Sequence, residues 1–156
     1  MEKGLLDLHN LLRWVVLLLA LLTVFGSLSG MTSGKTFTAR NKKIALFFLI
    51  SCDLQLLIGL ALYFLGPWGI KNMQNMGMGA AMKDPVSRFF GVEHAIGMLI
   101  AIVLVHIGYS SAKKNVADSA KFKKLFWYTV CALLIMIITI PWPFREAIAR
   151  PLFPGM

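Results

Sequence analysis

Four long apolar segments limit what this chain can fold into more than any other feature of its sequence. They lie at about residues 11–28, 44–65, 89–109 and 125–142, and none has a lysine in its interior. Each is close to the roughly 20 residues that an α-helix needs to cross the hydrocarbon core of a bilayer. Because hydrophobic residues also make up 58% of the chain, we predict an all-α integral membrane protein, a single domain over residues 1–156 built as a four-helix bundle.

The basic residues are concentrated in two of the connections between these segments, although the whole chain carries a formal net charge of +9. The positive-inside rule therefore predicts that both connections are cytoplasmic, that the helices alternate up and down, and that both termini lie outside. Positive charge so placed is typical of membrane topology and of contact with anionic lipid in the bilayer, and we expect no nucleic-acid partner. The basic residues concerned are Lys35, Arg40, Lys42, Lys43, Lys113, Lys114, Lys121, Lys123 and Lys124, opposed by Asp118.

Two histidines are predicted to face each other in the outer half of this bundle. At about 100° per residue, His9 and Arg13 share one stripe of the first helix, and His94 lies on a face of small residues on the third. The first and third helices run in the same direction, so the two histidines lie at comparable depth. Facing imidazoles from separate helices suit the ligation of a haem iron, with Arg13 and Arg88 pairing with the propionates. The alternative is that His9 and Arg13 lie at the headgroup level, where Arg13 snorkels.

A second polar pair is expected deeper in the membrane. Asp53 lies near the middle of the bilayer and is the costliest residue of the sequence to place in lipid. It is either kept neutral or paired with a group on a neighbouring helix such as His106, which makes the two a candidate proton or polar site. His106 lies about 18 Å along its helix from His94 and cannot bind the same iron. A simple hydrogen-bonded histidine near the inner interface is the alternative for His106.

The outer connection after the second helix is rich in methionine, with Met73, Met76, Met78 and Met82. Thioethers are soft ligands for Cu(I), so copper handling is one hypothesis for this loop. Adaptable packing of the loop onto the bundle is the other.

Four stretches of the sequence together resemble a family of small four-helix bacterial inner-membrane proteins labelled cytochrome b-like. These stretches are residues 8–14 (LHNLLRW), 54–60 (LQLLIGL), 92–94 (VEH) and 140–144 (IPWPF). The resemblance covers nearly the whole chain and implies a protein of the bacterial inner membrane that binds haem b and transfers electrons, with His9 and His94 as the matching ligands. It departs from two-haem cytochromes b in its small number of histidines.

These observations favour a cytochrome b-like protein that holds at most one haem near the outer face and exchanges electrons with a quinone or a larger membrane complex. An electron carrier or accessory protein fits the sequence better than a stand-alone enzyme, since no nucleophile is predicted next to a base. The main alternative is a cofactor-free accessory or assembly subunit, in which the small and polar residues serve helix packing.

Overall fold

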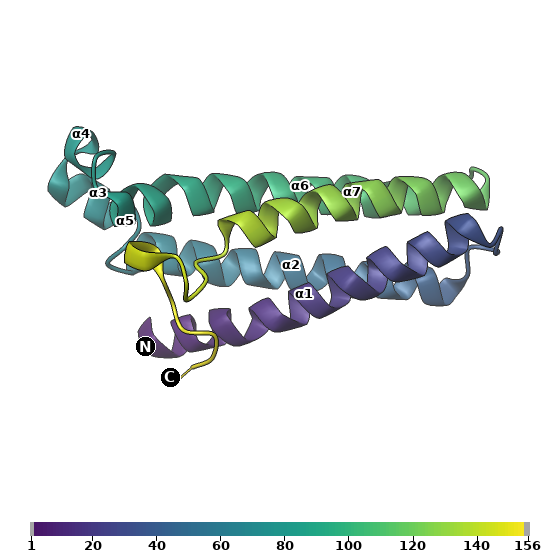
Figure 1. Ribbon diagram of the computed structural model, residues 1–156, viewed down its shortest axis with the longest axis horizontal. Coiled ribbons are helices and arrows are strands. Elements are labelled where there is room, and N and C mark those ends of the chain that lie inside the picture. Colours follow the sequence, from purple (N-terminus) through teal and green to yellow (C-terminus); the bar gives the residue numbers. More distant parts are fainter. Residues whose placement is uncertain (1, 155–156) are drawn as a thin grey trace.

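The computed structural model describes residues 2–154, and its main feature is a bundle of long helices. These are α1 (Glu2–Thr32), α2 (Ala39–Leu65), α6 (His94–Ala112) and α7 (Asp118–Thr139). Within the described residues, four helical segments are long and apolar enough to cross a membrane, as predicted. The chain passes back and forth along the bundle, so that both ends of the chain lie at the same end of it (Figure 1).

Short elements connect α2 to α6 at the end of the bundle that also holds the two chain ends (Figure 1). We call this the histidine end, because His9 and His94 lie in its half of the bundle, and the opposite end, formed by residues 33–38 and 113–117, the basic end. The short elements are α3 (Ile70–Met76), α4 (Met78–Ala81), α5 (Pro85–Arg88) and the π-helix η1 (Phe89–Glu93), and a 3₁₀ turn, η2 (Glu146–Ile148), follows α7.

Local side-chain and proline chemistry explains where the helical segment before α6 begins and where α7 ends. Asp84 caps α5, its carboxylate accepting a bond from the Ser87 amide, and Pro85 takes the first helical position. The helix α7 ends at Thr139, three residues before the far bound of the fourth predicted apolar segment at about residue 142. Ile140 adopts a ψ of 133°, since the following Pro141 disfavours helical backbone in the residue before it.

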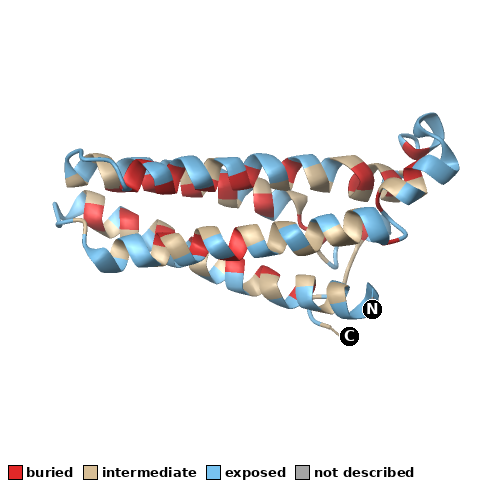
Figure 2. Cartoon of the chain, turned by 180° about the vertical axis from the view of Figure 1, so that it is seen from behind, coloured by how far each residue is buried: buried red, intermediate tan, exposed pale blue. Residues whose placement is uncertain are grey.

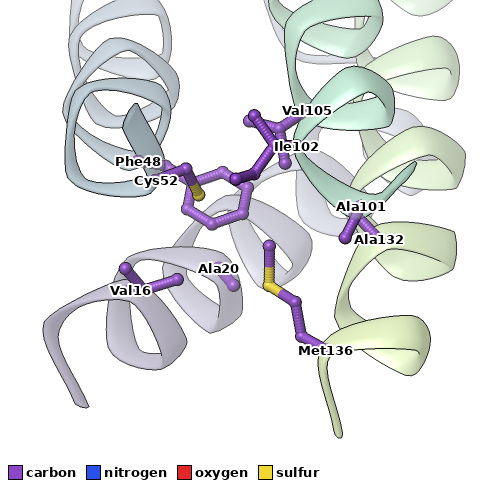
Figure 3. Packing of buried hydrophobic residues seen from close by; sticks show 9 residues of the cluster. All are labelled: Val16, Ala20, Phe48, Cys52, Ala101, Ile102, Val105, Ala132 and Met136. Carbon is purple, nitrogen blue, oxygen red and sulfur yellow. The ribbon is translucent and has the colours of Figure 1, made fainter. Parts of the chain in front are cut away.

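The core runs along the inside of the bundle, where α1 packs on α2 and α7, and α6 packs on the same two helices. Figure 2 shows buried residues between the helices and exposed ones around the outside. The stripe of α1 that holds Arg13 faces inward, since Arg13, Val16, Ala20, Thr23 and Ser27 are all buried. The main cluster draws on every long helix (Figure 3) and consists of Val16, Ala20, Phe48, Cys52, Ala101, Ile102, Val105, Ala132 and Met136.

The outside of the bundle carries large apolar side chains, among them Leu18, Phe25, Leu57, Leu134 and Ile138. In water such a surface would be an extensive apolar patch, whereas in a bilayer it faces hydrocarbon of its own kind. Burial and exposure therefore agree with a membrane protein whose distinguishing chemistry lies on the inside.

Candidate functional site

A cavity of about 540 Å³ lies inside the histidine end of the bundle. All four long helices contribute to its lining, and its volume is within the range of about 300–1,000 Å³ that cofactor and small-molecule sites occupy. Leu60, Ile96 and Leu99 line it and are also exposed on the outside. The cavity therefore opens sideways between α2 and α6, toward the region that lipid would fill.

His9 of α1 and His94 of α6 face each other across this cavity. Their ring centres lie 6.3 Å apart and their planes are inclined by 68°. Both residues line the cavity and both are only half-buried within the bundle. The structure thus brings together the two histidines that helical spacing placed at the same depth.

The backbone of α7 orients the ring of His94. Its Nδ1 atom lies 2.8 Å from the carbonyl oxygen of Thr139, and because a carbonyl only accepts, the proton is on Nδ1 and the Nε2 lone pair is left free. Gly97, one turn further along α6, makes this contact possible. A Cβ on Gly97 would overlap the Cγ2 methyl of Thr139, so glycine lets α7 approach closely enough to present its carbonyl.

A π-helical turn places His94 at the start of α6. In η1 the amide of His94 donates to the carbonyl of Phe89, five residues back. The Tyr63 hydroxyl of α2 donates to the Gly91 carbonyl inside the same turn, at 3.1 Å. Such single π turns are rare and are frequent at functional sites. Nothing in the composition of residues 89–93 distinguishes this turn from an ordinary helix, so the sequence did not reveal it.

Arg13 is buried beneath the segment that follows η2. Only 7% of it is exposed, and its Nη2 donates to the Leu152 carbonyl at 2.7 Å. The indole of Trp14 donates to the same carbonyl at 3.0 Å, and the Trp14 ring stacks on Phe153. Residues 150–153 therefore fold back across α1, and Arg13 is held by backbone carbonyls within an aromatic surround that includes Trp142.

Three polar atoms that line this part of the cavity are buried and have no hydrogen-bond partner in the described residues. They are Nδ1 of His9, Nε of Arg13 and Oε1 of Gln55. Gln55 uses its amide nitrogen to donate to the His9 carbonyl at 3.0 Å. These three atoms are polar points in the lining of a cavity that is otherwise mostly apolar.

The remaining predicted arginine lies elsewhere. Arg88 is exposed and donates to the Glu93 carboxylate at 2.7 Å, outside the cavity lining. Arg150, unlike Arg88, lines the cavity, and its guanidinium lies 4.5 Å from the ring centre of Phe90. Partial burial lowers the pKa of Arg150 from its ordinary value, although it stays charged.

Asp53 and His106 form a pair on the outer surface between α2 and α6. The Nε2 atom of His106 lies 2.8 Å from Oδ1 of Asp53, as the helix positions suggested. They lie in a separate groove that shares only Leu56, Leu99 and Ile102 with the cavity at the histidine end.

The four methionines of the outer connection do not point to one place. Met73 is buried against Gly91, where a Cβ would overlap its sulfur. The Met76 sulfur lies 3.3 Å from the Ser87 hydroxyl oxygen, and Met78 and Met82 are exposed. Met73 is thus a packing residue of the cavity wall.

Across residues 2–154, no three side chains of the histidine, cysteine, aspartate or glutamate type come together as a site for a bare metal ion. Two facing imidazoles alone leave most of a metal's coordination positions unfilled.

No family model matches this sequence, and neither a curated protein nor a solved structure matches it.

Proposed function

We propose that this protein binds one haem b between His9 and His94 at the histidine end of the bundle and carries electrons in a bacterial inner membrane. The observation that carries the proposal is the pair of histidine rings 6.3 Å apart in a cavity of about 540 Å³. By the positive-inside rule, the basic end faces the cytoplasm and the histidine end faces outward.

His9 and His94 would hold the haem iron through their ring nitrogens, and the two ring centres lie 6.3 Å apart. Haem would bring the remaining ligands of its own iron, so two histidines would suffice to hold haem where they would not hold a bare ion.

The tautomer of His94 also favours ligation. With Nδ1–H donating to the Thr139 carbonyl, Nε2 carries a free lone pair, and a fixed backbone acceptor is the usual partner of a ligating histidine. On the other side, Gly59 leaves room beside His9, since a Cβ there would come 3.3 Å from Cε1 of that ring. The donor set and the space therefore fit the group.

Charged side chains in the lining of the cavity suit the carboxylates of haem. Arg13 has an unpartnered Nε and Arg150 lines the same cavity, so these two guanidinium groups are the donors we assign to propionates. Haem supplies a one-electron redox centre when it is bound. The protein holds it in an apolar interior and leaves an opening between α2 and α6 through which a membrane-soluble electron carrier such as a quinone can approach.

The test is the optical spectrum of the protein purified from cells supplied with haem precursor. We expect a Soret band that shifts on reduction, and its loss in His94→Ala and in His9→Ala. His106→Gln is the matched control, because it removes the third histidine of the chain on the same helix as His94 but outside the cavity.

A folded, colourless preparation would overturn the haem proposal and favour a cofactor-free accessory subunit. A band that persists in both alanine variants would show that haem is held by other residues. Loss of the band in His106→Gln alone would likewise exclude the ligand pair proposed.

A further inference from the structure

We propose that Asp53 and His106 form a reversible protonation site inside the membrane that water reaches from the basic end, along the groove between α2 and α6. The pair is joined by a contact of 2.8 Å. Its members are unusually open for ionisable groups in a membrane span, with 39% of the Asp53 side chain and 49% of the His106 side chain exposed.

The depth of the pair makes this exposure costly. Asp53 lies about 18 Å from Leu65, where α2 ends at the histidine end of the bundle. His106 lies about 9 Å from Ala112, where α6 ends at the basic end. Both positions fall within the hydrocarbon region of a bilayer about 30 Å thick. Ionisable side chains at such depth almost always face a protein interior or water, because lipid cannot solvate them.

The groove around the pair is polar on one side only. It has a volume of about 490 Å³, and toward the basic end its lining continues through Ser110, Ser111 and Lys114. Toward the histidine end its lining is apolar and consists of Leu56, Leu99 and Ile102, which also line the other cavity. This asymmetry directs access to the basic end.

The charges of the groove allow the pair to gain and lose one proton. With one proton shared between Nε2 and Oδ1 the pair is net neutral, and without it the pair carries one negative charge. That charge faces the ammonium of Lys114, the one other ionisable side chain in the lining of this groove. The proton comes from water in the groove and returns to it, so no other reactant is required.

Ionisable groups on the packed helices face other places. Cys52, next to Asp53 on α2, is in the core, and Arg13 of α1 lies in the histidine-end cavity. Cys131 of α7 is exposed but is not part of the groove. The Asp53 and His106 pair is therefore affected chiefly by its own partner and by Lys114.

Cysteine labelling in lipid nanodiscs tests the access path without any need for haem. In a Cys131→Ser background, single cysteines replace Ser110, Ile107 and Val103, which line the groove, and Ile100, an exposed residue of the same helix outside it. A membrane-impermeant thiol reagent that reacts only with hydrated thiolates is expected to label the three groove positions and not Ile100→Cys. Labelling confined to Ser110→Cys would overturn the proposal, as would equal labelling at all four positions.

Histidine NMR tests the protonation itself. The chain has 3 histidines, so ¹⁵N-histidine labelling with His106→Gln as the assignment variant isolates the signal of His106. A reversible change of that signal with pH is expected, and Asp53→Asn is expected to displace it. A His106 signal that does not respond to pH, or that responds identically in Asp53→Asn, would refute a shared protonation site.

Discussion

The carbonyl of Thr139 and the ring of His94 lie 2.8 Å apart only because Gly97 lets α7 come close to α6. We therefore expect Gly97→Ala to destabilise the bundle by about 1–3 kcal/mol, the usual effect of overpacking a helix contact. The measurement is unfolding in mixed detergent micelles.

Thr139→Ser supplies the internal check of that prediction. It removes the Cγ2 methyl that an alanine at position 97 would overlap and keeps the hydroxyl that donates to the Ile135 carbonyl. The double variant should recover most of the lost stability. Gly26→Ala is the matched control, because a Cβ there meets nothing within 4 Å, and it should be neutral or stabilising by up to about 1 kcal/mol. Equal effects at positions 26 and 97 would contradict the close-packing account.

The π turn before His94 depends on Tyr63. Tyr63→Phe removes the hydroxyl that donates to the Gly91 carbonyl and should lower the free energy of unfolding by about 1 kcal/mol. Amide hydrogen exchange over residues 89–94 should accelerate at the same time. Tyr128→Phe is the comparison, because Tyr128 lies on α7, away from η1 and outside the cavity lining. Unchanged exchange in Tyr63→Phe would show that η1 is held by other contacts.

Arg13 and Trp14 hold residues 150–153 against α1. Trp14→Phe keeps the ring but loses the bond to the Leu152 carbonyl, so a loss of about 0.5–1.5 kcal/mol is expected. Arg13→Ala should cost about 1.5–3 kcal/mol, because a charged donor is removed from a buried carbonyl. Both variants should expose the segment to carboxypeptidase. Arg88→Ala breaks only an exposed ion pair and should cost less than about 1 kcal/mol.

The cap at Asp84 predicts a pH dependence at the start of the third span. Hydrogen bonds from the Ser87 hydroxyl and amide hold the pKa of Asp84 below its ordinary value. A carboxylate whose pKa is lowered by folding stabilises the fold above its unfolded pKa, and this stabilisation is lost as pH falls through the folded pKa. Amide exchange at residues 85–88 should therefore accelerate in acid in the wild type, and should be fast and far less dependent on acid in Asp84→Ala. If amide exchange at residues 85–88 responds to acid in the same way in the wild type and in Asp84→Ala, the cap is not the cause of the response.

The long helices and the inward faces were predictable because hydropathy and helical spacing are properties of side chains. The meeting of His9 with His94 and of Asp53 with His106 followed from the same spacing. The packing of residues 150–153 over Arg13 was not predictable from the sequence, since the acceptors of Arg13 are backbone carbonyls, which every residue has.

The sequence predicted Arg88 near the haem propionates because residues 88–93 read as part of a regular α-helix, with no sign of the π turn η1. Positions five apart do not face each other on a regular α-helix, so Glu93 was no obvious partner for Arg88. The structure nevertheless pairs the two side chains across the π turn, which leaves Arg150 as the second guanidinium of the cavity.

The hydrogen bonds between α1 and residues 150–153 form late in biosynthesis. Arg13 and Trp14 emerge from the ribosome well over a hundred residues before Leu152, the residue whose carbonyl they bind. Until then the Arg13 guanidinium lacks these carbonyl acceptors. The side of the cavity that Arg13 lines is therefore covered only after residues 150–153 have been synthesised.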